Sequence, residues 1–311
     1  MDKISLNYDI VERSVKSFIN HVFLQGLHRT FQMTDCHSVR CYFYGMNNDL
    51  DLIIKQYPED QNVLRVYAIG DVHVGSPQFD ERAIRKKIKI IHDDPCAAVC
   101  LCGDLGDYGL KNSVSNVYQA TLSPREQMDY IYELFLPVAD KIAACVPGNH
   151  EDRITKEVGI CPMLTICSRL GCPEVYRESV AITKYIFGRW KGTVKPMSFI
   201  GITLHGSTQY KHRKHIACYD GVDLAISGHC HAPTYVPHGR IRIDSHNASA
   251  QHVPYKEIVV DANLIPGGYG IKKEYEIAPP PELQYIELSG YREPNNKRTK
   301  RRVMDFHSIQ I

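Results

Sequence analysis

Five short apolar runs dominate the middle of the chain, and all of them end in the same few residue types. They are VLRVYAIGD (63–71), AAVCLCGD (97–104), IAACVPGNH (142–150), FIGITLHG (199–206) and VDLAISGHCH (222–231). Short continuous apolar runs are typical of strands that are buried on both faces. Each run closes on glycine together with aspartate, asparagine or histidine, so five predicted strands share a polar ending.

Helix-like segments lie between the predicted strands. They cover residues 80–94, 123–141 and 148–171, and each follows one of the first three runs. Pro124 stands in the first turn of the second segment, where the missing N–H of a proline does no harm. Strands that alternate with helices in this way predict an α/β core.

The pattern of apolar stretches and turns changes after residue 235. Strand-like stretches that are separated by turns cover residues 239–244, 256–264, 272–279 and 284–291. These stretches predict a second sheet or the far half of a β-sandwich.

The N-terminal part has a different pattern. Over residues 8–30, apolar side chains recur at three- and four-residue steps, at Val11, Val15, Phe18, Val22, Phe23 and Leu27. This spacing predicts one face of an amphipathic helix, which either packs on the main core or binds a partner. CYFYG (41–45) predicts a short strand, and YPEDQN (57–62) predicts a turn.

A basic stretch, NNKRTKRR, occupies residues 295–302 near the C-terminus. It predicts either a solvated tail or an arm that contacts phosphate groups. We therefore expect three regions. Residues 1–60 form an N-terminal extension with a helix and a strand, residues 61–290 form the main domain, and residues 291–311 form a basic C-terminal tail.

The composition indicates the cellular compartment and the kinds of partner that we expect. The 311 residues carry a formal net charge of +2, so no strong field draws the protein to anionic lipid or nucleic acid. Several of the eleven cysteines sit inside apolar runs, which favours free, buried thiols in a reducing compartment. The first residues are too charged for a signal peptide, and no apolar run is long enough to span a membrane. We expect a cytoplasmic protein without membrane contact. The sequence leaves the oligomeric state open, with a dimer as one option.

Metal-binding residue types lie at all five predicted strand ends. In an α/β sheet, ligands bind outside the carboxyl ends of the strands. The candidates are Asp71, His73, Asp104, Asp107, Asn149, His150, His205, His229 and His231. Imidazole and carboxylate without thiolate suit manganese, iron, zinc or nickel. This many donors exceeds what one ion needs, so two divalent metal ions that share a carboxylate fit better.

The GHCHAP motif at residues 228–233 supplies the last two histidines. In an extended segment, residues two apart point to the same side. We therefore expect His229 and His231 to face the site together and Cys230 to point away, with Cys230 as a ligand the less favoured alternative.

The order of these motifs resembles that of the calcineurin-like metallophosphoesterase superfamily. GDVHVG, GDLGD, GNHE, a lone HG and GHCH follow one another between about residues 64 and 233. The resemblance implies a four-layer α/β fold, a β-sandwich flanked by helices, with residues 61–290 as the metallophosphoesterase domain. It also implies two divalent metal ions at the strand ends, with manganese the first choice.

The resemblance further assigns individual roles. It gives one ion to Asp71, His73 and His231, the other ion to Asn149, His205 and His229, and a bridging position to Asp104. It implies that His150 is a catalytic general acid or transition-state stabiliser, and that Asp107 orients it, unless Asp107 only caps a turn. The implied reaction is an in-line attack on phosphorus by a hydroxide that bridges the two ions.

Two positions depart from the Ser/Thr protein phosphatase branch, which carries arginines after the second aspartate block and before GNHE. These positions hold Tyr108 and Pro147, and the GDLGD and GHCH forms look more like the phosphodiesterase and repair-nuclease branches. Arg153 is a candidate for phosphate binding or a solvated helix residue. Tyr210, in the basic stretch GSTQYKHRKH (206–215), is a candidate for stacking on a base or part of an exposed loop.

We therefore expect a metal-dependent phosphodiesterase or nuclease whose substrate is a phosphate ester of a nucleic acid or nucleotide. A phosphomonoesterase for a small substrate is the first alternative. A non-catalytic scaffold of the same fold is the second, and the intact ligand set and His150 argue against it.

Overall fold

The computed structural model describes residues 50–110, 117–188, 196–207, 211–267, 280–294 and 300–311. The chain divides into two units, Met1–Gly45 and Met46–Ile311, and every described residue belongs to the second. The helix predicted over residues 8–30 and the strands predicted over 41–45 and 272–279 lie outside the described residues.

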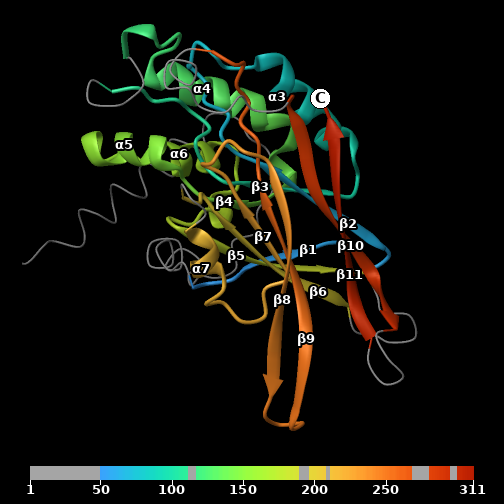
Figure 1. Cartoon of the computed structure of the whole chain (residues 1–311). Coiled ribbons are helices and arrows are strands. Elements are labelled where there is room, and N and C mark those ends of the chain that lie inside the picture. The colour runs from blue at the N-terminus through green and yellow to red at the C-terminus, as the bar shows by residue number, and fades with distance from the viewer. Residues whose placement is uncertain (1–49, 111–116, 189–195, 208–210, 268–279, 295–299) are drawn as a thin grey trace, which may run out of the picture. The chain divides into compact units, whose positions relative to one another are not determined.

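One sheet has five strands in the order β11-β10-β2-β3-β4 (Figure 1). Their bounds are Val63–Ile69 for β2, Ala97–Leu101 for β3, Ile142–Cys145 for β4, Glu282–Pro294 for β10 and Lys300–Gln310 for β11. β2, β3 and β4 run parallel, while β10 is antiparallel to both β2 and β11. The three parallel strands therefore end at the same edge, and the loops that follow them lie together.

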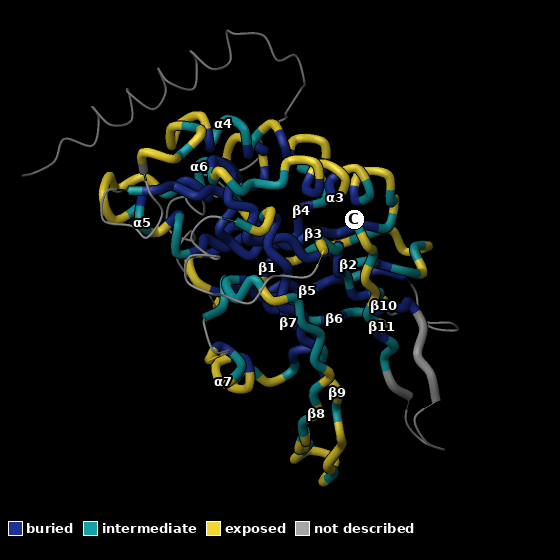
Figure 2. Tube along the Cα trace, turned by 45° about the horizontal axis from the view of Figure 1, so that its top comes forward, coloured by how far each residue is buried: buried dark blue, intermediate teal, exposed yellow. Residues whose placement is uncertain are grey.

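The other sheet has six strands in the order β1-β5-β6-β7-β9-β8. Their bounds are Ile53–Gln56 for β1, Val180–Phe187 for β5, Met197–Leu204 for β6, Leu224–Ser227 for β7, Thr234–Asp244 for β8 and Ser249–Val259 for β9. β6, β7 and β9 run parallel, so their carboxyl ends also share one edge. β8 and β9 form a long hairpin whose far end projects from the body and is largely exposed (Figure 2).

The two sheets pack face to face. Side chains alternate along each strand, so every second side chain points toward the other sheet. On β5, Thr183 and Tyr185 point inward. The Thr183 hydroxyl donates to the Ala143 carbonyl at 3.5 Å, and the Tyr185 hydroxyl lies 3.2 Å from Cys100 Sγ. The inner faces of both sheets therefore form one buried core.

Helices cover the outer faces. Their bounds are Glu81–Asp93 for α3, Pro124–Phe135 for α4, Asn149–Val158 for α5, Pro162–Arg169 for α6 and His212–Ile216 for α7, with 3₁₀ turns η1 at Val117–Gln119, η2 at Leu136–Lys141 and η3 at Pro173–Val175. α3 and η2 contact β3, and α4 contacts α3 and α6 (Figure 1). On the six-stranded sheet, Ile216 of α7 packs with the outward-facing Ile182 and Ile202. The order helix, sheet, sheet and helix confirms the predicted α/β sandwich flanked by helices.

The five apolar runs all form strands, namely β2, β3, β4, β6 and β7. The segment 148–171 forms two helices, because Gly159 ends α5 in the left-handed region at φ 69° and Pro162 begins α6. β5 has no counterpart among the predictions. Its sequence, VAITKYIF, is rich in strand-forming residues but carries none of the polar endings that mark the other runs.

The C-terminal tail predicted over residues 291–311 is wrong for residues 300–310, which form β11. β11 pairs antiparallel with β10, and Arg302 ties it to the other sheet. Its guanidinium donates to both carboxylate oxygens of the buried Asp223, at 2.6 and 2.7 Å, and to the Ser198 carbonyl at 2.9 Å. Part of the basic stretch therefore pairs with a buried acid of the neighbouring sheet.

The region predicted as an N-terminal extension includes β1, which pairs in parallel with β5 and so belongs to the six-stranded sheet. The turn predicted after it, over residues 57–62, includes a turn at 59–60. Within the described ranges, no helix is long and apolar enough to cross a membrane. The nine cysteines described there are free thiols.

Replacing Arg302 with alanine should destabilise the fold, because Asp223 would remain buried without its cation. Truncating one partner of a buried ion pair costs about 3–5 kcal/mol, and we expect a loss of that size in the free energy of unfolding, measured by denaturant titration. Lys89→Ala is the control: it breaks the exposed Lys89–Asp93 pair at 2.6 Å and should leave the free energy of unfolding nearly unchanged. An Arg302→Ala protein as stable as the wild type would contradict the assignment.

Candidate metal centre

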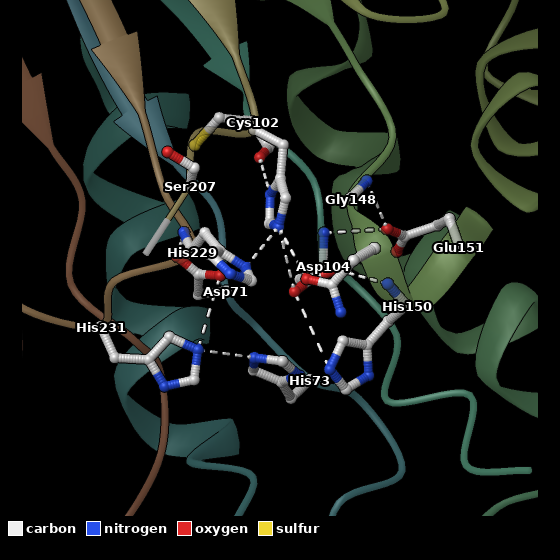
Figure 3. A network of polar contacts seen from close by, with 12 residues as sticks. Asp71, His73, Cys102, Asp104, Gly148, His150, Glu151, Ser207, His229 and His231 are labelled. Carbon is white, nitrogen blue, oxygen red and sulfur yellow. Dashed lines mark hydrogen bonds and ion pairs between the residues drawn. The ribbon is translucent and has the colours of Figure 1, made fainter. Parts of the chain in front are cut away.

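Loops from the carboxyl ends of both sheets meet at one place (Figure 3). Three groups of side chains bring their ligand atoms within 4.8 Å of one another there: Asp71 with His73 and His231, His73 with Asp104 and His150, and Asp104 with His205 and His229. Shared members join the groups, so the side chains form a single centre. The loops after β2, β3 and β4 of the five-stranded sheet and after β6 and β7 of the six-stranded sheet contribute to it.

The backbone at this centre is strained. Among the described residues, seven other than glycine have a positive φ, and five of them are candidate ligands: Asp71 (49°), His73 (53°), Asp104 (51°), His229 (69°) and His231 (54°). The left-handed conformation costs an L-residue roughly 1–2 kcal/mol. Such strain gathers where a function requires a particular side-chain direction, and here it accompanies five side chains that converge.

Asp71, His73 and His231 form the first donor group. Asp71 is fully buried, and its Oδ2 accepts from the His229 N–H at 2.7 Å, while its Oδ1 has no hydrogen-bond partner among the described residues. The Nε2 atoms of His73 and His231 lie 3.1 Å apart, and His231 Nε2 lies 3.6 Å from Asp71 Oδ1. A buried carboxylate oxygen without a donor, beside two imidazole nitrogens, fits a cation.

Asp104, Asn149, His205 and His229 form the second donor group. His205 Nε2 lies 3.1 Å from Asn149 Oδ1, 3.0 Å from His229 Nδ1 and 3.3 Å from Asp104 Oδ2. His205 Nδ1 donates to the Cys102 carbonyl at 2.8 Å. In the neutral ring, Nε2 therefore presents a lone pair to the other three atoms.

The amide of Asn149 has two orientations with different consequences. With Oδ1 toward His205, lone pairs face one another, which is unfavourable unless a cation lies among them. With the amide turned over, its nitrogen donates to His229 Nδ1 at 2.8 Å and to Asp104 Oδ2 at 3.2 Å, and Oδ1 accepts from Arg153 at 3.0 Å. The first orientation is a donor set for a metal ion, and the second satisfies the same side chains without one.

The electrostatics of the centre follow from Asp104. Burial opposes protonation of His205, but the Asp104 carboxylate outweighs it and raises the pKa of His205 to about 10. Burial also acts to raise the pKa of Asp104, yet the imidazoles of His205, His150 and His73 hold that pKa well below its usual range. Burial, aided by neighbouring imidazoles, lowers the pKa of His73. A metal ion bound here would displace the proton from His205.

His150 borders the centre at the start of α5. Its ring Nδ1 donates to the Asp107 backbone carbonyl at 2.5 Å, its N–H donates to Asp104 Oδ1 at 2.8 Å, and its Nε2 lies 3.9 Å from Asp104 Oδ2. The Asp107 carboxylate lies 3.7 Å from His150 Nδ1 and 3.8 Å from His73 Nδ1. The Asp107 carbonyl thus accepts the hydrogen bond of His150 Nδ1, and the Asp107 carboxylate, the group that the resemblance assigns to orient His150, lies beside the same nitrogen.

Glu151 supports the centre and is absent from the predicted site residues. It is fully buried, and its carboxylate accepts the N–H groups of Asp104 (2.9 Å), Leu105 (2.9 Å), Gly106 (3.1 Å) and Gly148 (2.8 Å). Burial and the Asp104 charge raise the pKa of Glu151, while these N–H donors act against the rise. The GNHE motif contains the signal, because a glutamate three residues after a helix N-cap has capping-box spacing.

The two histidines of GHCH converge for a different reason from the one predicted. The segment is not extended, because both His229 and His231 have left-handed backbone conformations. They join different donor groups, His229 with Asp104 and His231 with Asp71. The Cys230 thiol donates to the Ser207 carbonyl at 3.2 Å, so it is directed toward that loop and not toward the donor atoms.

The candidate substrate residues have different outcomes. Arg153 is half-buried on α5, with its NH1 atom 3.4 Å from His150 Nδ1. Tyr210 lies outside the described residues. In the same basic stretch, His212 is buried and Arg213 pairs with Glu257 at 3.0 Å, so these two basic residues serve the protein interior.

Comparison with known proteins gives one family match. A family model described as calcineurin-like phosphoesterase matches residues 64–233, which is more than half of the chain. No curated protein matches the chain.

Similar solved structures include a predicted phosphoesterase from Streptococcus pneumoniae, which is 11% identical with a TM-score of 0.35, over 79% of this chain and 90% of that one. Vps29 from Chaetomium thermophilum is 10% identical with a TM-score of 0.33, over 80% and 98% of the two chains. The NAD nucleotidase of Haemophilus influenzae is 9% identical with a TM-score of 0.37, over 73% of this chain and 47% of that one.

Metal binding should tighten as the pH rises. A metal ion needs the neutral ring of His205, whose pKa is raised to about 10, so a proton must leave at neutral pH. For one displaced proton, the affinity should rise by about tenfold per pH unit between roughly pH 6 and 8. Calorimetric titration with Mn²⁺ in buffers of different ionisation enthalpy measures both the affinity and the proton release. His205→Gln, without the titrating ring, should bind weakly and with a flatter pH profile. A wild-type affinity for Mn²⁺ that does not change with pH would contradict the role of His205 as a ligand.

Proposed function

Because the chain belongs to the calcineurin-like phosphoesterase family, we propose that it is a binuclear metal-dependent phosphodiesterase that acts on a nucleic acid or a nucleotide. The observation that carries the proposal is the carboxylate of Asp104, which lies within 4.8 Å of a ligand atom of His73, from the first donor group, and of His205 and His229, from the second. The buried Asp71 Oδ1, which lacks a hydrogen-bond partner among the described residues, supports the same conclusion.

The two donor groups offer ligands for one ion each. Asp71, His73 and His231 would hold the first ion, and Asn149, His205 and His229 would hold the second, with Asp104 between them. Oxygen and nitrogen donors without thiolate suit manganese, iron, zinc or nickel, and the carboxylate and amide oxygens favour manganese.

The chemistry divides between the ions and the protein. When bound, two such ions neutralise charge on the phosphate oxygens and lower the pKa of a water nucleophile. The protein supplies geometry: Glu151 holds the loop that carries Asp104, and the Asp107 carbonyl fixes the Nδ1–H of His150. His150 Nε2 is then free to face the centre and to give a proton to the leaving oxygen of an ester.

The residues around the centre favour a diester. Tyr108 and Pro147, which stand where protein phosphatases have arginines, are both buried and offer no cation. A phosphate monoester carries a charge of about −1.5 to −2 at pH 7, whereas a diester carries one negative charge, so a centre without those two arginines suits a diester better. The exposed Lys211 and Lys214, shortly after His205, can attract a polyanion.

Model esters test the substrate class directly. With Mn²⁺ bound, we expect kcat/KM for bis-p-nitrophenyl phosphate to exceed that for p-nitrophenyl phosphate by about tenfold or more, which is about 1.4 kcal/mol of transition-state preference. Protein stripped with a chelator is the control and should be inactive. The opposite preference would make the protein a phosphomonoesterase, and two bound ions without turnover of either ester would make it a scaffold.

His150→Asn should separate catalysis from metal binding. The variant keeps two bound ions but loses the proton donor, so kcat should fall by about 10²–10⁴. Metal content by mass spectrometry and steady-state kinetics on the diester measure the two effects. The contrasting variant is Asp104→Asn, which should lose both turnover and ions because one carboxylate serves two ions. Loss of metal from His150→Asn would move His150 into the ligand set.

A further inference from the structure

His212 lies between the two loops that bring His205 and His229 to the centre. The ring Nδ1 atom of His212 accepts a hydrogen bond from the backbone N–H of Ser207 at 3.2 Å, and the backbone N–H of His212 donates to Ser207 Oγ at 3.1 Å. Its Nε2 atom lies 3.1 Å from Ser227 Oγ. Ser207 follows His205 by two residues, and Ser227 precedes His229 by two residues. One buried side chain therefore joins both loops.

The two loops also contact each other directly. The Gly228 N–H donates to the His205 carbonyl at 2.7 Å. Gly206 has a φ of 101°, and a Cβ atom there would lie 2.9 Å from the Gly228 carbonyl oxygen and 3.5 Å from His212 Nδ1. The loops are thus packed without spare room, and a displacement of His212 would change their spacing.

A buried carboxylate, that of Glu257, also contacts His212 at Nε2. Glu257 is 1% exposed, and its oxygens lie 3.3 Å from His212 Nε2, 3.0 Å from Arg213 Nε and 2.6 Å from His238 Nε2. Burial acts to raise the pKa of Glu257, but hydrogen bonds from these three partners lower it to about 2. Glu257 is therefore an anion at neutral pH and a fixed acceptor.

The partners of His212 also determine its tautomer. Nδ1 accepts from the Ser207 N–H, so in the neutral ring the proton resides on Nε2, which donates to Ser227 Oγ or Glu257 Oε1. Both ring nitrogens have specific partners, which fixes the plane of the ring and its position between the loops.

We infer that His212 is a positioning residue that sets the spacing between His205 and His229, and with it the affinity for the second metal ion. The two imidazoles lie with His205 Nε2 and His229 Nδ1 3.0 Å apart. This role presupposes the metal centre of the proposed function and adds a residue outside its ligand set. It implies unequal effects on the two ions. The second ion draws two ligands from these loops, whereas the first draws only His231.

A matched pair of variants tests this role. His212→Gln and His238→Gln make the same chemical change at two histidines that share Glu257. A glutamine at position 212 can reach Ser227 but leaves the Ser207 N–H without its acceptor. His238 bonds to Glu257 from β8 and stacks on Tyr255, so its replacement disturbs the carboxylate without removing the bonds between the loops.

Calorimetric titration with Mn²⁺ gives the readout. Wild type and His238→Gln should each bind two ions with similar affinities. His212→Gln should bind the first ion as the wild type does and the second about 10–100-fold more weakly, the usual effect of losing an outer-sphere partner. His212→Asn keeps an acceptor for the Ser207 N–H, so it should restore part of the lost affinity for the second ion. If circular dichroism shows that His212→Gln is unfolded, His212→Asn takes its place in the comparison.

The outcomes are distinct. Equal weakening of both ions in His212→Gln, or the same affinity for the second ion in the His212 and His238 variants, would overturn the positioning role. Wild-type protein that binds fewer than two ions would instead overturn the proposed function, whatever the variants do.

Discussion

The carboxylate of Asp104 is the group on which the rest of the centre depends. It follows β3 of the five-stranded sheet, and its Oδ2 lies 3.3 Å from Nε2 of His205, which follows β6 of the six-stranded sheet. Its pKa is held well below the usual range despite burial, so it remains charged and attracts either imidazole protons or metal ions. Because the donors come from both sheets, cations bound here would also join the sheets, and metal affinity would be linked to stability.

Placing this carboxylate requires a backbone that is unfavourable by itself. Asp104 and the preceding Gly103 have φ values of 51° and 88°. Glu151 offsets the cost by accepting four N–H groups, three from this loop and one from Gly148. Gly148 is needed as well, because a Cβ atom there would collide with the Asp104 carboxylate. The four residues of GNHE therefore have different roles. Gly148 leaves space for the Asp104 carboxylate, and the Asn149 side chain lies beside His205. His150 faces the centre, and Glu151 holds the loop that carries Asp104.

The sequence was sufficient where neighbouring residues decide the outcome. Buried parallel strands are continuous apolar runs, and their carboxyl ends share an edge, so β2, β3, β4, β6 and β7 and the residues after them could be found from the pattern. The sequence was insufficient where a residue is held by an interaction partner that lies far away in the chain. Arg302 of β11, for example, pairs with Asp223, 79 residues away. The positions of Glu151 and His212 depend on N–H groups and hydroxyls of loops that only the folded chain brings near. The bend at 228–231 has the same origin, because Asp71, far away in the chain, accepts the His229 N–H.

Anomalous diffraction from crystals grown with manganese tests the central claim most directly. Two peaks about 3.5–4 Å apart are expected, with the Asp104 carboxylate between them. One peak should lie among Asp71, His73 and His231, and the other among Asn149, His205 and His229. A single peak, no peak, or peaks remote from Asp104 would contradict the account.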